Sequence, residues 1–124
     1  MQNNSAHMEL SIVIPTCNEE GNIVSMYERL LAVMNEIQVA NFEFVFVDDG
    51  SSDNSLLRIQ ELRAKDSRVK FIQLSRNFGH QNALKAGLDH AQGAAVISMD
   101  ADLQHPPELI PTLFEKWKAG FEVV

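Results

Sequence analysis

Two aspartates separated by one residue, Asp100 and Asp102, follow an apolar run late in the chain. Residues two apart in an extended turn point the same way, so both carboxylates could bind one hard cation. Oxygen ligands favour Mg²⁺ or Mn²⁺, and the side chain of Gln104 could add a carbonyl oxygen. An isolated Asp-x-Asp can also merely cap a helix or solvate a loop. Its place directly after residues 96–99 favours the metal site.

A second group of acidic and hydroxyl side chains begins at Asp48. In structural terms, Gly50 is expected to make a turn, and Asp53 or Ser51 is expected to cap the helix that follows. In chemical terms, Asp48 or its neighbour Asp49 could accept a hydrogen bond from a base or a ribose at the end of a strand. The two interpretations are compatible.

The remaining polar candidates give weaker signals. Arg76 is the one cation expected near these acids, and it predicts either a phosphate contact or a surface salt bridge. His80, His90 and His105 lack metal-ligand spacing. Cys17 is the single cysteine, so a disulfide framework is excluded, and a small buried thiol is favoured over a nucleophile. Neither a G-x-G-x-x-G pattern nor a P-loop pattern is present.

Alternating strands and helices must position these residues. Apolar runs predict strands at about 10–14, 42–47, 69–74 and 94–99, with the start of a fifth at 121–124. Amphipathic helices are expected between them, and the third carries Leu84, Leu88 and Ala91. Pro15 is expected to end the first strand, Gly93 to end the third helix as a left-handed cap, and Pro111 to distort the first turn of the last helix.

This alternation predicts an α/β fold, with a Rossmann-like, mostly parallel sheet and helices on both faces. The polar residues after the strands then gather at the carboxyl edge of the sheet, where such folds bind ligands. A chain of 124 residues with 45% hydrophobic and 22% charged residues suits one small globular domain. The net charge of −7 argues against nucleic acid as a partner and is compatible with a bound cation.

The combined pattern resembles a known family. Residues 11–20, 47–53 and 100–108 are together similar to family 2 glycosyltransferases of the GT-A fold. The run 74–80 resembles the branch that contains dolichol-phosphate mannose synthases and bacterial polyprenyl-phosphate glycosyltransferases. We expect residues 1–9 to be a disordered tail. Residues 10–124 are expected to form the nucleotide-sugar-binding part of a glycosyltransferase domain truncated at its C-terminus, a fragment that is inactive alone.

The resemblance implies roles for the binding residues. Pro15, Glu19 and one or both of Asp48 and Asp49 would line the nucleotide pocket, and Arg76 is the candidate for a phosphate contact. The donor would be a UDP- or GDP-linked sugar. The acceptor would be a polyprenyl phosphate, which places the full-length protein at the cytoplasmic face of a membrane, in contact with it through the C-terminal part.

The resemblance also implies the chemistry. Asp100 and Asp102, helped by Gln104, would hold Mg²⁺ or Mn²⁺ against the donor diphosphate, and the cation would stabilise the departing nucleotide. The family transfers a hexose by direct displacement with inversion at C1. Two alternatives stay open: a response-regulator-like receiver domain, which also uses clustered carboxylates and Mg²⁺, and a non-catalytic α/β interaction module.

Overall fold

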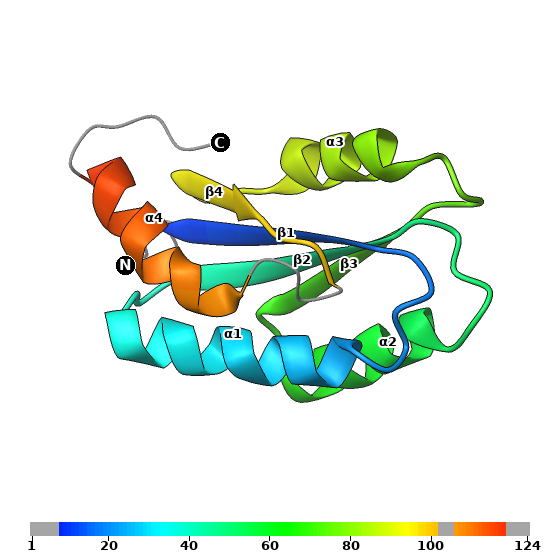
Figure 1. Ribbon diagram of the computed structural model, residues 1–124, viewed down its shortest axis with the longest axis horizontal. Helices are drawn as coiled ribbons and strands as arrows, with labels where there is room; N and C mark the ends of the chain where they lie inside the picture. The colour runs from blue at the N-terminus through cyan, green and yellow to red at the C-terminus, as the bar shows by residue number, and fades with distance from the viewer. Residues whose placement is uncertain (1–7, 102–105, 119–124) are drawn as a thin grey trace, which may run out of the picture.

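The computed structural model describes residues 8–101 and 106–118 (Figure 1). Its strands are β1 (Leu10–Thr16), β2 (Phe42–Asp48), β3 (Val69–Gln73) and β4 (Ala95–Ser98). Its helices are α1 (Ile23–Ile37), α2 (Ser55–Lys65), α3 (His80–His90), the 3₁₀ turn η2 (Pro107–Leu109) and α4 (Ile110–Lys118). No described helix is long and apolar enough to cross a membrane. The tail residues 1–7 and the fifth strand expected at 121–124 lie outside the described residues.

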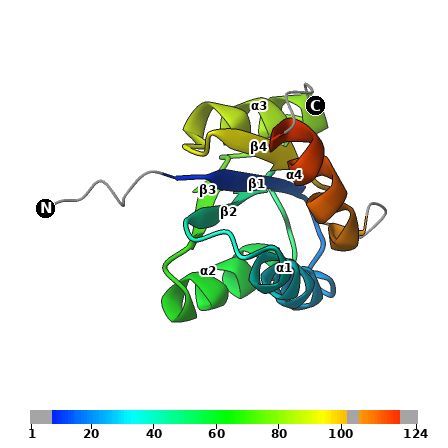
Figure 2. The ribbon, with the colours of Figure 1, turned by 90° about the vertical axis from the view of Figure 1, so that its left-hand side faces the viewer.

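The strands form one sheet in the order β3-β2-β1-β4, and every neighbouring pair is parallel. Helices α1 and α2 lie on one face and α3 on the other (Figure 2). The predicted α/β fold, with a parallel sheet covered on both faces, is therefore confirmed. The chain passes from β1 out to β3 and then returns to place β4 on the far side of β1. The strand order thus reverses between β1 and β4, the point where open α/β sheets bind ligands.

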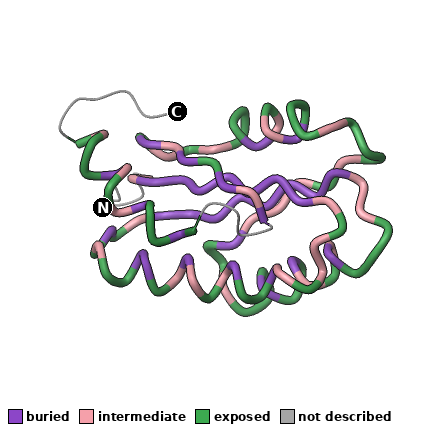
Figure 3. The backbone as a smooth tube through the Cα atoms, in the orientation of Figure 1, coloured by how far each residue is buried: buried purple, intermediate pink, exposed green. Residues whose placement is uncertain are grey.

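Side-chain alternation along the strands divides the core into two layers. Phe44 and Phe46 of β2 are fully buried on the side of α1 and α2, where Ile110 of α4 joins the same cluster. Val45 and Val47 point the other way, toward α3. Figure 3 shows the consequence: β1 and β2 are buried along their whole length, β3 and β4 are buried only in part, and the helices are exposed on their outer surfaces. The packed sheet therefore holds in place the ends of the loops that leave its carboxyl edge.

The prediction that Pro15 ends the first strand is wrong, because β1 continues to Thr16 and Pro15 pairs with Val47 of β2. The proline instead marks where β1 and β4 separate. The carbonyl of Val13 accepts the last bond from β4, from the N–H of Met99 at 2.9 Å. Groups two residues apart point to the same side of a strand, so Pro15 faces β4 with no N–H to continue the ladder. The sheet therefore opens between these strands at its carboxyl edge.

Helix α3 packs on the sheet through small residues. Ala83 and Gly87 are its buried positions, whereas Leu84 is half-buried and Leu88 is 46% exposed. The two leucines of this helix therefore do not make its closest contact with the sheet. A Cβ atom on Gly87 would lie 2.3 Å from Cγ1 of Val13, so only glycine allows the helix to come this close to β1. Leu84 and Leu88 each follow one of these small residues, so the leucines lie beside the contact with the sheet rather than within it.

Gly93 is not the left-handed helix cap that was expected. Helix α3 ends at His90, and Gly93 is not among the described residues with positive φ. A Cβ atom at Gly93 would lie 2.6 Å from the backbone nitrogen of Ser11 and 2.7 Å from the carbonyl oxygen of Ala95. Glycine is therefore required here by close backbone approach to β1.

The distortion expected near Pro111 is confirmed. The turn before it, η2, is a separate 3₁₀ turn that begins at Pro107, and α4 begins only at Ile110. Pro111 thus occupies the first turn of α4, where its missing N–H breaks no intrahelical hydrogen bond.

Candidate functional site

A pocket of about 340 Å³ opens at the carboxyl edge of the sheet, where β1 and β4 separate. It brings together four residues of the predicted site: Pro15, Glu19, Asp49 and Asp100. The other lining residues are Thr16, Cys17, Asn77, His80, Ala83 and Ala101. The predicted residues Asp102 and Gln104 lie outside the described residues, and Asp48 and Arg76 do not line the pocket.

The pocket is acidic. Glu19, Asp49 and Asp100 contribute three carboxylates, and no Lys or Arg is among the described lining residues. Crowded carboxylates repel one another unless a cation or hydrogen-bond donors compensate. No group of three or more His, Cys, Asp or Glu side chains in the described ranges is placed to bind a metal. Mg²⁺ commonly takes only one or two carboxylates, with phosphate and water oxygens, so Asp100 fits as one ligand of such an ion.

His80 is the residue that the sequence analysis left without a role. Its Nε2 lies 2.9 Å from Oδ1 of Asp100, so the first residue of α3 contacts the predicted metal ligand after β4. The two side chains are 56% and 34% exposed, and both line the pocket. Spacing along the chain could not reveal this contact, because 20 residues separate the pair. Only the return of the chain from α3 to β4 creates it.

Asp49 is buried, with 4% of its surface exposed, and it organises the loop before α3. Its Oδ1 accepts the N–H of Phe78 at 2.8 Å, and its Oδ2 accepts the N–H of Gly79 at 3.2 Å. Asn77 braces the same loop, since its Oδ1 accepts the N–H of Gly79 at 3.0 Å and its Nδ2 donates to Sγ of Cys17 at 3.2 Å. Asp49 therefore positions backbone at the rim of the pocket.

Gly50 makes the expected turn after β2, with a φ of 71°. Its second role is steric. A Cβ atom at Gly50 would lie 2.3 Å from the backbone nitrogen of Asn77 and 2.4 Å from the carbonyl carbon of Arg76. The loop before α3 therefore rests directly on the backbone of this glycine, which only a residue without a side chain permits.

Asp48 and Arg76 lie beside the pocket rather than in its wall. Asp48 is 3% exposed, and its Oδ1 has no hydrogen-bond partner within the described residues. An unpaired buried oxygen of this kind is costly unless a donor is supplied from elsewhere. The guanidinium of Arg76 lies over the ring of Phe78, 4.6 Å from its centroid. Within residues 8–101 and 106–118 it has no carboxylate partner, so the salt-bridge alternative is not realised there.

Asn18 joins the loop after β1 to the loop after β2. It adopts the left-handed conformation, with a φ of 55°, which asparagine tolerates well. Its side-chain Oδ1 accepts the N–H of Ser52 at 2.8 Å, and its own N–H donates to Oγ of Ser51 at 2.9 Å. Ser51 is therefore used to bind the neighbouring loop, and of the two residues expected to cap α2 it is not the one that does so.

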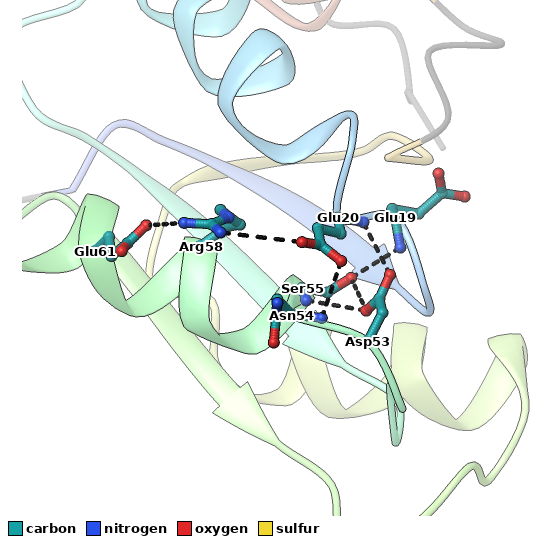
Figure 4. Close-up of polar contacts among 7 residues, drawn as sticks. All are labelled: Glu19, Glu20, Asp53, Asn54, Ser55, Arg58 and Glu61. Atoms are coloured by element: carbon teal, nitrogen blue, oxygen red, sulfur yellow. Dashed lines mark hydrogen bonds and ion pairs between the residues drawn. The ribbon is translucent and has the colours of Figure 1, made fainter.

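Figure 4 shows the second half of this junction, where the start of α2 meets residues Glu19 and Glu20. The N–H of Glu19 donates to Oγ of Ser55 at 2.8 Å, and the N–H of Glu20 donates to Oδ2 of Asp53 at 3.2 Å. The Oδ1 of Asp53 accepts the first N–H of α2, from Ser55, at 2.9 Å. Asp53 therefore caps this N–H from the position before the N-cap residue, Asn54, which makes no side-chain cap hydrogen bond of its own.

The same contacts set the ionisation of Asp53 and the direction of Glu19. Desolvation acts against the charged form of Asp53, but hydrogen bonds from the Ser55 hydroxyl and N–H outweigh it and hold the pKa of Asp53 below its ordinary value. The carboxylate of Glu19 points away from this cluster in Figure 4, and its Oε1 accepts Nδ2 of Asn22 at 2.8 Å. The junction therefore fixes the backbone of Glu19 while its side chain lines the pocket.

Comparison with known proteins places this arrangement in a family. Residues 11–124 match the family described as "Glycosyl transferase family 2". A Bacillus subtilis protein named "Uncharacterized glycosyltransferase YkcC" is 52% identical over 120 residues, which cover 97% of this chain and 37% of that protein. The "Bactoprenol glucosyl transferase" of Shigella phage SfV is 44% identical over 117 residues, 94% of this chain and 38% of its own length. The chain thus spans little more than a third of these curated relatives.

A solved structure shares the fold. Glucosyl-3-phosphoglycerate synthase from Mycobacterium tuberculosis, in complex with Mn²⁺, UDP and glucosyl-3-phosphoglycerate, superposes with a TM-score of 0.62 and 26% identity. The match covers 91% of this chain and 40% of that one. The fold is the GT-A fold, and the family match replaces the receiver-domain interpretation. In that synthase complex, a nucleotide and a divalent cation accompany this fold.

Proposed function

Because this chain belongs to glycosyltransferase family 2, we propose that residues 10–124 form the nucleotide-sugar-binding part of a metal-dependent, inverting glycosyltransferase. The reaction moves a hexose from a UDP- or GDP-linked donor to a polyprenyl phosphate. The observation that carries the proposal is the acidic pocket at the switch point between β1 and β4, lined by Glu19, Asp49 and Asp100. Hydrogen bonds within the protein compensate these carboxylates in part, and a cation at Asp100 would offset the negative charge that an anionic donor adds beside them.

The donor nucleotide is proposed to lie across the ends of β1 and β2. Pro15 and Glu19 form one wall of its pocket, and Asp49 holds the loop that forms another. The unpaired Oδ1 of Asp48 offers a buried acceptor for an N–H of the base or a hydroxyl of the ribose. Arg76, without a carboxylate partner among the described residues, is the candidate for a phosphate contact at the rim.

The proposed displacement needs few groups from the protein. Asp100 and Asp102, with Gln104, would hold the cation, and its Lewis acidity would stabilise the nucleoside diphosphate as a leaving group. An acceptor oxygen forms a bond to C1 of the sugar from the face opposite the diphosphate. The C1–oxygen bond to the diphosphate breaks, its electron pair stays on the diphosphate oxygen, and the configuration at C1 inverts. A lipid phosphate is already anionic, so this step requires no strong general base.

The identity of the acceptor rests on similarity to a relative along the chain and on the resemblance of one loop. The bactoprenol glucosyl transferase of phage SfV is 44% identical to this chain across 94% of its length. The loop of residues 74–80, which contributes Asn77 and His80 to the pocket, is the segment that resembles the polyprenyl-phosphate branch. A lipid acceptor in turn places the full-length protein at the cytoplasmic face of a membrane.

Calorimetry tests the proposal. The full-length protein is titrated with UDP and with GDP, each with and without Mn²⁺, and one of the two is expected to bind more tightly with the metal. Asp102→Ala should abolish the gain from metal. Asp89→Ala is the matched control, because Asp89 is an exposed carboxylate of α3 that pairs only with Lys85 within the described residues. Absence of binding by either nucleotide, with Mn²⁺ and with Mg²⁺, would refute the proposal.

A further inference from the structure

We infer that His80 is a positioning residue for the carboxylate of Asp100, and through it for the divalent cation; this inference rests on the proposed function. The imidazole Nε2 lies 2.9 Å from Oδ1 of Asp100, and both side chains line the pocket. An ionised carboxylate can only accept hydrogen bonds, so Nε2 is the donor in this contact. Both the neutral Nε2–H tautomer and the imidazolium can donate it, so the role does not depend on the charge of the ring.

The histidine is well placed for this role because its own backbone is anchored. It is the first residue of α3, and the two residues before it donate their N–H groups to the buried carboxylate of Asp49. Asp100, by contrast, follows β4 at the point where its pairing with β1 has ended. The hydrogen bond therefore connects Asp100, which lies beyond the paired part of β4, to the first residue of α3.

A hydrogen bond that orients a ligand carboxylate should raise the affinity of the site for metal. The imidazole holds one carboxylate oxygen, Oδ1, which restricts rotation of the group and leaves the other oxygen available to a cation. Partners that hold a ligand in this way typically contribute about 10- to 100-fold to metal affinity. The pair itself is solvent-accessible, with side chains 56% and 34% exposed, so its loss should change the stability of the fold little.

Three variants at one position separate this role from alternatives. His80→Ala removes the donor. His80→Gln places an amide nitrogen close to the position of Nε2, where it can still donate to Asp100, whereas His80→Asn places its nitrogen near that of Nδ1, too far away to do so. Recovery by glutamine but not by asparagine therefore identifies the position of Nε2, where the imidazole meets Asp100, as the place where a polar group is required.

The measurement is the affinity for Mn²⁺, read from the electron paramagnetic resonance signal of free aqueous Mn²⁺ during titration of the full-length protein. The protein is saturated with UDP in one series and with GDP in another. We expect His80→Ala and His80→Asn to weaken Mn²⁺ binding by about 10- to 100-fold and His80→Gln to stay close to wild type. The Tm and the metal-free nucleotide affinity should be the same in all four proteins.

The outcomes separate this inference from the proposed function. If wild type binds Mn²⁺ with nucleotide and His80→Ala binds it equally well, the positioning role is refuted and the proposed function stands. If glutamine restores no more affinity than asparagine at equal Tm, the hydrogen-bond explanation is likewise overturned. If wild type binds no Mn²⁺ with either nucleotide, both the role of His80 and the proposed function fail.

Discussion

Replacing Glu43 removes a buried carboxylate that connects three strands and the loop before β4. The side chain is 1% exposed, and its Oε2 accepts both the Ser11 hydroxyl at 2.6 Å and the N–H of Gln92 at 2.8 Å. Its Oε1 accepts Nζ of Lys70 at 2.8 Å. Ser11 in turn accepts the N–H of Gly93 at 2.8 Å, which completes the link.

The cost of two substitutions can be worked from these contacts. Glu43→Leu leaves the Ser11 hydroxyl and the Gln92 N–H without their acceptor, at roughly 1–3 kcal/mol for each, and we take about 3 kcal/mol in all. Lys70 is 40% exposed and can turn to water, so it adds little. Glu43→Gln can keep its carbonyl oxygen in the place of Oε2 and lose only the lysine, at about 1 kcal/mol.

Guanidinium and thermal unfolding followed by circular dichroism measure both values. For a chain of 124 residues, about 3 kcal/mol corresponds to a fall in Tm of roughly 10 °C. The matched control is Glu61→Leu, because Glu61 pairs with Arg58 at 2.7 Å but is 50% exposed, and we expect a change within about 0.5 kcal/mol. A Glu43→Leu protein as stable as the control, or a Glu43→Gln protein as unstable as Glu43→Leu, would refute the reasoning.

The same network sets a dependence on pH. Burial acts against ionisation of Glu43, but hydrogen bonds from Lys70, Ser11 and the Gln92 N–H outweigh it, so the pKa of Glu43 lies below 4.5. A carboxylate with a lowered pKa in the folded state adds stability above its unfolded pKa and loses it as the pH falls through the folded value. The stability difference between wild type and Glu43→Gln should therefore shrink below about pH 4.5.

Three further substitutions test other parts of the structure. The Arg68 guanidinium holds the pKa of Asp66 at about 2, so wild type should lose stability as the pH falls from 3.8 toward 2, and Asp66→Asn should lose less in acid titrations of unfolding. Gly50→Ala should cost at least about 1–3 kcal/mol in guanidinium unfolding, from its positive φ and its contact with the next loop; an unchanged midpoint would contradict this. Asp49→Asn leaves one acceptor oxygen for two N–H groups, so it should speed hydrogen exchange at Phe78 or Gly79, measured by NMR; unchanged exchange at both would show that the loop is held by other contacts.

The repeating pattern of the chain was enough to predict the sheet and the edge that carries the pocket. Apolar runs identified all four described strands, and the polar residues after them identified Glu19, Asp49 and Asp100 as neighbours. These inferences succeed because strand alternation and parallel crossovers follow from local sequence.

Contacts between distant segments could not be predicted in this way. The role of Gly93 depends on how closely β1 approaches, and the pairing of His80 with Asp100 depends on the crossing from α3 to β4. Pro15 was misread because its effect depends on which neighbouring strand its nitrogen faces. Each of these is a property of the assembled sheet rather than of the residues nearby in sequence.

The central claim is that a divalent cation at Asp100 joins the donor diphosphate to the carboxyl edge of the sheet. Anomalous diffraction from crystals of the full-length protein grown with Mn²⁺ and UDP or GDP tests it most directly. We expect a manganese peak between the carboxylate of Asp100 and the diphosphate, with the base beside β2 near Asp48. A nucleotide bound away from this pocket, or bound in it with no manganese at Asp100, would contradict the claim.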